Sequence, residues 1–112
     1  MNSEIKAPDR VLSSIGLAKR AGKTVTGTEL VQDAVRKGKA KIVIAASDIS
    51  QGSKKKLVNT CVYYKAELVE YSDMKSLSAA MGVKKLITSV AVTDENFKIL
   101  IKKQLSVMTE ND

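Results

Sequence analysis

The sequence contains no histidine and a single cysteine, Cys61. Without histidine, no Ser–His or Cys–His nucleophile pair and no histidine-ligated zinc site can form. A lone cysteine excludes an internal disulfide as well as the paired-cysteine metal and redox motifs. Because most common catalytic and metal-binding constellations are thereby removed, we expect a protein that is not an enzyme and that needs no cofactor and no metal.

Aromatic residues and long apolar runs are also scarce. The aromatic side chains are those of Tyr63, Tyr64, Tyr71 and Phe97. Proteins that read RNA by stacking bases on aromatic platforms need more of them, which disfavours that class. The longest apolar run, residues 42–46, is far shorter than the roughly 20 residues of a membrane-spanning helix. Residues 1–10 contain no signal-peptide core, so we expect a cytoplasmic location.

Acidic residues are outnumbered by basic ones. The chain has 19 Lys and Arg against 12 Asp and Glu, which gives a formal net charge of +7. Such a balance predicts a polyanionic partner, with nucleic acid first and an acidic membrane surface second. The 112 residues suit a single domain over 1–112, and the hydrophobic fraction of 44% is enough for a core.

Apolar periodicity alternates between the helical and the strand pattern along the chain. It predicts helices over residues 8–19, 26–38, 51–64, 72–82 and 95–108, and strands over residues 24–26, 42–46, 68–71 and 86–92. The wholly apolar run at 42–46 is typical of a central strand that is covered on both faces. The pattern therefore predicts a three-layer α/β/α sandwich around a mixed sheet of about four strands.

Local signals indicate how these helices begin and what they bury. The segment TGTE that starts at Thr26 matches a capping box, in which the Thr26 hydroxyl accepts a hydrogen bond from the Glu29 amide. Ser72 is a candidate cap for the fourth helix, and Thr93 or Asp94 for the last. The predicted buried stripe of the second helix consists of Leu30, Val31, Ala34 and Val35.

One short motif resembles a phosphate-binding P-loop. Gly22, Lys23 and Thr24 match its end, but the position five residues before Gly22 is Leu17 rather than glycine. A P-loop also follows a strand and precedes a helix, whereas here a helix precedes and a strand follows. The order of elements therefore argues against nucleotide binding.

Two acidic residues share one face of the second helix. Glu29 and Asp33 are four residues apart and so lie side by side on the helix, where two carboxylates can do acid–base work. Acidic residues near a helix start also stabilise its dipole, and Lys37 is placed one turn further to pair with Asp33. We therefore interpret both acids as structural rather than catalytic.

Three further features allow both a structural and a functional interpretation. Residues 54–56 are consecutive lysines, which form either a solvated face or an RNA-phosphate contact. Tyr63 and Tyr64 could stack on bases, but one of them is expected to be half-buried at a helix end. Cys61 lies on an apolar helical stripe and is expected in the core.

Four sequence blocks together resemble a known family. They are IGLAKRAGKTVTG, ELVQDAVRKGKAKIVIAASD, KKKLVNTCVYYKAELVEY and SVAVTDENF, and the similarity around them spans roughly residues 11–98. In this order and spacing they resemble the small bacterial YlxQ proteins, within the superfamily of kink-turn-binding ribosomal proteins of the archaeal and eukaryotic large subunit. The resemblance implies an α/β/α sandwich that binds structured RNA without catalysis.

The resemblance also implies which residues contact RNA. In the kink-turn binders, the start of the second helix reads a bent RNA loop with a glycine, a small residue, Asn, Glu, two variable residues and Lys. These places correspond here to Gly27, Thr28, Glu29, Leu30 and, at the Lys place, Asp33. An acid and a leucine are common in YlxQ-like relatives, whereas Asp33 replaces a cation by an anion.

Two other segments and a set of cations complete the implied site. The loop after the fourth helix contains Val83, Lys84 and Lys85, and the turn after the first main strand contains Ser47 and Asp48. These segments are expected to converge with the start of the second helix at one end of the sandwich. Glu29 could then accept hydrogen bonds from bases, while surrounding cations hold phosphates. These cations are Lys19, Arg20, Lys23, Lys84 and Lys85.

The sequence thus predicts an RNA-binding protein that recognises bent or folded RNA. Association of this protein with the ribosome is compatible with that prediction. The alternative is a protein-interaction adaptor on the same fold, with reduced RNA binding. Selective loss of RNA affinity on substitution of Glu29 or Lys84 would distinguish the two.

Overall fold

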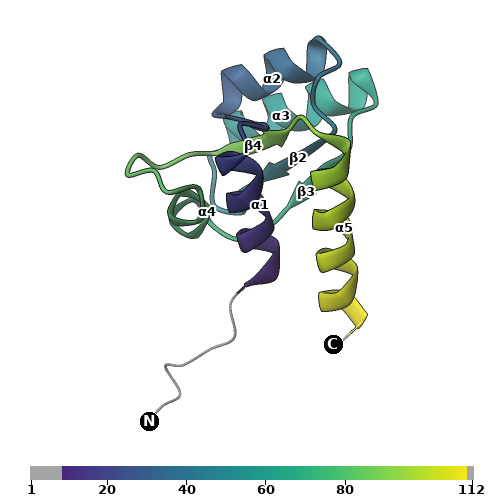
Figure 1. Cartoon of the computed structure of the whole chain (residues 1–112). Helices are drawn as coiled ribbons and strands as arrows, with labels where there is room; N and C mark the ends of the chain where they lie inside the picture. Colours follow the sequence, from purple (N-terminus) through teal and green to yellow (C-terminus); the bar gives the residue numbers. More distant parts are fainter. Residues whose placement is uncertain (1–8, 111–112) are drawn as a thin grey trace.

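The computed structural model describes residues 9–110, in which helices and strands alternate along the chain (Figure 1). The helices are α1 (Arg10–Arg20), α2 (Thr28–Arg36), α3 (Gln51–Tyr64), α4 (Met74–Met81) and α5 (Glu95–Glu110). The strands are β1 (Thr24–Thr26), β2 (Ile42–Ala45), β3 (Leu68–Glu70) and β4 (Ser89–Val92). No helix in the described part of the chain is long and apolar enough to cross a membrane.

The four strands form one mixed sheet in the order β1-β4-β2-β3. β4 is antiparallel to both of its neighbours, β1 and β2, whereas β2 and β3 are parallel. The last strand of the chain therefore lies inside the sheet, between the first two. This arrangement confirms the predicted mixed sheet of four strands.

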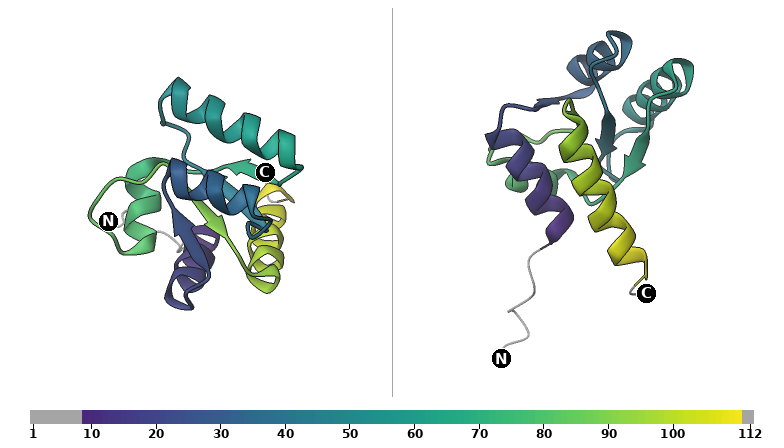
Figure 2. Two further views of the ribbon diagram at one scale, coloured as in Figure 1. Left: turned by 90° about the horizontal axis from the view of Figure 1, so that it is seen from above. Right: turned by 45° about the vertical axis from the view of Figure 1, so that its right-hand side comes forward.

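The helices cover both faces of the sheet (Figure 2). On one face, α1, α4 and α5 pack against Ile42, Ile44, Val90 and Val92. On the other, α2 and α3 pack against Val43, Ala45 and Ala91. Successive residues of β2 and β4 thus point to opposite faces, and both sides of these strands are buried. The predicted three-layer α/β/α sandwich is confirmed.

Short side chains at the helix starts fix where three helices begin. Asp9 accepts a hydrogen bond from the Leu12 amide of α1, and Ser50 accepts one from the Ser53 amide of α3. Asp94 caps α5, as one of the two predicted residues. Such caps satisfy amide groups that have no partner within the helix.

The predicted cap of α4 is wrong. Asp73, not Ser72, accepts the hydrogen bond from the Ser76 amide, at 2.7 Å. Ser72 instead adopts a left-handed conformation, with φ of 65°, in the turn that leads from β3 to α4. The aspartate is therefore the last non-helical residue, which is where a cap must sit.

The predicted capping box of α2 and the predicted start of β4 are also wrong. Thr26 is the last residue of β1, paired with Val90, and Gly27 takes the N-cap position without any side-chain cap. β4 begins at Ser89 rather than at Leu86, whose side chain is exposed. In both cases the requirements of the sheet override the local sequence signal.

Candidate nucleic-acid interface

Thr88 connects three segments that are far apart in sequence. Its hydroxyl oxygen lies 2.8 Å from the Thr28 Oγ1 at the start of α2. Its backbone carbonyl accepts a hydrogen bond of 2.9 Å from the Ala46 amide, just after β2, and the next carbonyl, of Ser89, accepts one from the Gly27 amide. The start of α2, the residues just after β2 and the end of the loop 82–88 therefore meet at one edge of the sheet, here called the Thr88 edge.

Gly27 sets the direction in which α2 leaves the sheet. Its φ of 93° and ψ of 149° lie in a region that side chains rarely allow, so a glycine is required there. Because no side chain caps α2, amide groups of its first turn keep hydrogen-bonding capacity at the Thr88 edge. Together with the positive end of the helix dipole, these amides favour an electron-rich ligand such as a phosphate or a base oxygen.

Glu29 and Leu30 present contrasting side chains beside these amides. Both are exposed, and Leu30 keeps 60% of its surface accessible. The prediction that Leu30 belongs to the buried stripe is wrong, since α2 buries Val31, Ala34 and Val35. Leu30 is adjacent to Val31 in sequence, but the turn of the helix carries it out of the contact with α3. The Thr88 edge therefore offers a carboxylate acceptor next to an apolar surface.

Asp33 lies one turn further along α2 and is neutralised within the helix. Its Oδ2 lies 3.0 Å from the Lys37 Nζ, which confirms the predicted pair. The Asp33 side chain is 48% exposed, so this pair adds little to stability. It does, however, direct the carboxylate toward the C-terminal end of α2 and away from the Thr88 edge.

Ser47 and Asp48 tie the end of β2 to the start of α4. The Ser47 amide donates to the Ser72 carbonyl, and the Asp48 Oδ1 accepts a hydrogen bond of 2.8 Å from the Met74 amide. Both side chains are exposed at the Thr88 edge, as their segment was predicted to be. Asp48 thus has a structural partner in addition to its predicted role.

The loop after α4 contributes two free cations and one partly buried valine. Lys84 and Lys85 are exposed and have no ion-pair partner among residues 9–110. Val83 packs part of its side chain against the core. Ser78 of α4 anchors both ends of the loop. Its Oγ accepts a hydrogen bond from the buried Ile87 amide, and its carbonyl accepts one from the Val83 amide.

The cations around α1 do not gather at the Thr88 edge. Lys23 immediately precedes β1, whose first residue pairs with Val92. The Lys23 carbonyl accepts a hydrogen bond from the Thr93 amide. Lys23 therefore lies at the end of β1 opposite to Gly27, roughly 13 Å away for four residues of extended chain. Lys19 is exposed in the last turn of α1. The predicted ring of cations around Glu29 is thus open on this side.

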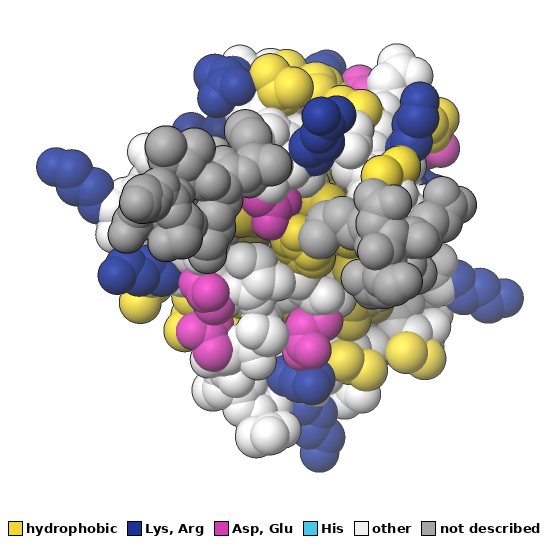
Figure 3. All heavy atoms as spheres, turned by 90° about the horizontal axis from the view of Figure 1, so that it is seen from below, with side chains coloured by type: hydrophobic (Ala, Val, Ile, Leu, Met, Phe, Trp, Pro, Cys, Tyr) yellow, Lys and Arg dark blue, Asp and Glu magenta, His cyan; other side chains and the backbone are white. Residues whose placement is uncertain are grey.

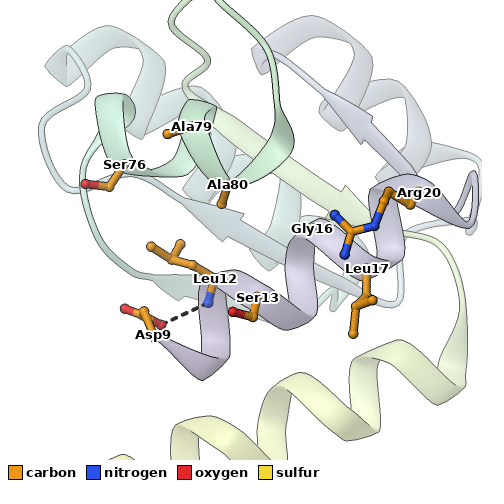
Figure 4. A pocket seen from close by; sticks show the side chains of 9 residues that line it. All are labelled: Asp9, Leu12, Ser13, Gly16, Leu17, Arg20, Ser76, Ala79 and Ala80. Atoms are coloured by element: carbon orange, nitrogen blue, oxygen red, sulfur yellow. Dashed lines mark hydrogen bonds between the residues drawn. The ribbon is translucent and has the colours of Figure 1, made fainter. Parts of the chain in front are cut away.

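Arg20 lies in a groove between α1 and α4 (Figure 4). The groove has a volume of about 690 Å³ and is lined by Asp9, Leu12, Ser13, Gly16, Leu17, Arg20, Ser76, Ala79 and Ala80. The guanidinium lies beside Gly16, where the backbone of Ala80 in α4 comes close to α1. Its charge is therefore held between these helices rather than beside Glu29.

Comparison with known proteins identifies the family of this chain. Residues 9–101 match the ribosomal protein L7Ae/L30e/S12e/Gadd45 family. The chain belongs to this family. Among its relatives, the RNA-binding protein YlxQ of Bacillus subtilis (strain 168) is 37% identical over 83 residues, which are 74% of this chain and 82% of the relative. The RNA-binding protein YlxQ of Enterococcus faecium is 38% identical over 73 residues, 65% of this chain and 71% of the relative.

Solved structures share this fold. A Bacillus halodurans C protein of unknown function superposes with a TM-score of 0.83 at 30% identity, covering 88% of this chain and 99% of that one. The Giardia lamblia 15.5kD RNA binding protein superposes with a TM-score of 0.73, covering 87% of this chain and 82% of that one. At 16% identity this second likeness speaks for the fold alone.

Two residues of this L7Ae-family chain that organise the Thr88 edge were not found from the sequence. Thr88 and Ser78 are half-buried and buried hydroxyl side chains that bridge segments distant in sequence. The available signal was a polar residue next to an apolar stretch, which is too common to identify a contact. Within residues 9–110 no group of three or more Asp, Glu, Cys or His side chains could hold a metal.

Proposed function

We propose that this L7Ae-family protein binds structured RNA through the Thr88 edge and carries out no catalysis of its own. The observation that carries the proposal is the convergence on Thr88 of the uncapped start of α2, the turn after β2 and the loop before β4. The names of two YlxQ relatives, which describe RNA-binding proteins, support it. Such a role agrees with the cytoplasmic location expected from the sequence.

The Thr88 edge offers different groups to different parts of an RNA. The free amides of the first turn of α2 suit phosphate or base oxygens, and the Glu29 carboxylate suits base N–H donors. The exposed side chain of Leu30 provides an apolar surface for an unstacked base. Lys84 and Lys85 supply the charge that phosphates require.

A bent RNA fits this arrangement better than a straight duplex. Only a bend or an internal loop exposes unpaired bases to Glu29 and Leu30 while phosphates remain within reach of Lys84 and Lys85. We therefore infer that kink-turn-like or otherwise folded RNA is the preferred ligand, with ribosomal RNA as one source. The Lys37 ammonium, 3.0 Å from the Asp33 carboxylate, offsets part of the negative charge that this position brings to α2.

A binding titration tests the proposal directly. The probes are a kink-turn RNA and a straight duplex of equal length, each measured at low and moderate salt. We expect tighter binding to the kink-turn RNA and a shallower dependence on salt, because contacts to bases add to those with phosphates. Equal and steeply salt-dependent binding to both RNAs would refute the proposal and favour the protein-interaction adaptor, for which the exposed Leu30 is equally suited.

Matched variants locate the binding. Leu30→Ala is expected to weaken kink-turn binding about fourfold or more, because each methylene that loses its apolar contact costs about 0.8 kcal/mol. Leu17→Ala, which alters an exposed leucine of α1, is the control and is expected to leave it unchanged. Lys84→Gln should reduce affinity for both RNAs, whereas Lys103→Gln on α5 should not. If each variant at the Thr88 edge changed RNA affinity no more than its control on α1 or α5, RNA would not bind at the Thr88 edge.

A further inference from the structure

The C-terminal ends of α2 and α3 lie together at the sheet edge opposite to the Thr88 edge. Each of these helices leads directly into one of the two parallel strands, β2 and β3, and parallel neighbours begin at the same edge. Both helices cover the same face and lie side by side (Figure 2, left). The Gln32 Nε2 donates a hydrogen bond of 2.8 Å to the Thr60 Oγ1, and one turn further along each helix come Arg36 and Tyr64.

Basic residues are concentrated at this opposite edge. The segment 36–41 reads RKGKAK and holds four of them, and a fifth follows α3. They are Arg36, Lys37, Lys39, Lys41 and Lys65, here called the Lys39 surface together with Tyr63 and Tyr64. All five are exposed, and within the described part of the chain only Lys37 has a carboxylate partner, Asp33.

Helix dipoles explain some of these cations but not all. Arg36, Lys37 and Lys65 lie in or next to the last turn of a helix, where positive charge is stabilising. Lys39 and Lys41 lie beyond α2, in a link whose backbone is fixed by bonds from the Lys39 amide to the Ala34 carbonyl and from the Lys41 amide to the Val92 carbonyl. The backbone of both residues is therefore fixed, while their exposed charges lie beyond the last turn of α2 and have no carboxylate partner among the described residues.

Aromatic side chains are exposed beside these cations. Tyr63 is 78% and Tyr64 is 45% exposed, and their ring centroids are 4.9 Å apart with planes at 74°. Tyr64 is thus about half-buried, as was expected of one of the two, whereas Tyr63 is largely exposed. A ring that is this accessible next to several cations can stack on an unpaired base whose phosphates the cations neutralise.

We propose that the Lys39 surface binds a single-stranded polynucleotide, with Tyr63 stacked on a base and Lys39 and Lys41 on its phosphates. A duplex offers no open base faces to Tyr63, which favours a single strand. The nearby carboxylate of Glu67 is engaged by Lys98 and Lys102, and on the face shown in Figure 3 acidic side chains likewise lie among the basic ones. Since the two sites occupy opposite edges of the sheet, the protein can hold a folded RNA and a single strand at once. The proposal does not depend on the Thr88 edge.

Titration with a short uridine oligonucleotide, as RNA and as DNA, tests this surface. Lys39→Gln with Lys41→Gln is expected to lower the slope of log affinity against log salt by about 1.4, the value for two phosphate contacts on a single strand. Lys75→Gln with Lys103→Gln removes the same charge elsewhere and is expected to leave the slope unchanged. If both pairs lower the slope equally, only net charge matters and the proposal is overturned.

Tyr63 variants separate stacking from charge. Tyr63→Ala is expected to weaken oligonucleotide binding about fivefold or more, whereas Tyr63→Phe keeps the ring and should bind as the native chain does. The ratio of RNA to DNA affinity identifies which polynucleotide is preferred. No loss in Tyr63→Ala, or no oligonucleotide binding by the native chain, would overturn the proposal and leave the exposed tyrosines as a protein contact.

A second titration distinguishes this surface from the Thr88 edge. The oligonucleotide is added to protein that is saturated with kink-turn RNA, and a ternary complex is expected. One-for-one displacement of the kink-turn RNA would show that a single surface serves both ligands, and would overturn the proposal. If the kink-turn RNA itself does not bind, the effects of Lys39, Lys41 and Tyr63 on oligonucleotide affinity still decide the matter.

Discussion

Gly16 allows α1 and α4 to approach more closely than any side chain would permit. A Cβ atom at this position would lie 2.7 Å from the carbonyl oxygen of Ala80, whereas real Cβ atoms essentially never come within 3.0 Å of a neighbour. The obstacle is backbone, so it cannot rotate away as a side chain could. Gly16→Ala must therefore push α1 and α4 apart.

Two opposing effects decide the size of the change. Alanine favours a helix over glycine by about 1 kcal/mol, while overpacking a buried contact typically costs about 1–3 kcal/mol. We expect Gly16→Ala to lower the free energy of unfolding by about 1 kcal/mol. For a chain of this size that corresponds to a fall in Tm of about 4 °C.

Gly52 provides the matched control for this substitution. It lies in the first turn of α3, where the nearest atom to an added Cβ is the Ser50 Oγ at 3.9 Å, an ordinary contact. Gly52→Ala should therefore stabilise the protein by up to about 1 kcal/mol. Urea denaturation of both variants measures the difference. If Gly16→Ala is as stable as Gly52→Ala, the close approach of α1 and α4 is not a constraint, and the reasoning from the Ala80 carbonyl fails.

Three further predictions concern buried and paired groups. Ser78→Ala leaves the buried Ile87 amide without its acceptor, and urea denaturation should show a loss of about 1–3 kcal/mol; an unchanged midpoint would contradict this. The hydrogen bond from Lys102 lowers the pKa of Glu67, so its contribution to stability is present above its ordinary pKa and is lost as the pH falls below it. Glu67→Gln should flatten that part of the stability profile, and an unaltered profile would exclude the pair. Burial raises the pKa of the Cys61 thiol, so it should react slowly with a thiol reagent until urea is added.

Elements with one dominant local signal could be predicted from the sequence. Residues 51–64 form α3 with the predicted bounds, and the apolar run at 42–46 contains β2 with both faces buried. Both follow from patterns that are complete within a few turns or one strand. Leu30 shows what such patterns cannot predict. Periodicity indicates an apolar stripe, but whether a residue at the margin of that stripe is buried depends on which side of α2 faces α3.

The candidate site was predictable as three segments but not as a set of contacts. Gly27, the turn after β2 and the loop after α4 do meet at one edge, yet Thr88, which joins them, was not singled out. A hydrogen bond between residues 60 apart has no local signature. Likewise Lys23 is close to Gly27 in sequence, but an extended strand separates them in space.

The position of β4 inside the sheet has a consequence for how the chain folds. β1 and β2 have no hydrogen bonds with each other and are joined only through β4, whose residues follow those of β1 by more than sixty positions. During synthesis, β1 and β2 cannot join into one sheet until β4 has been made. Pairing between strands so far apart in sequence slows folding. The segments around Thr88 come together in the same late step. A truncated or stalled chain that lacks β4 would therefore present α2 and the basic segment 36–41 that follows it without a formed Thr88 edge.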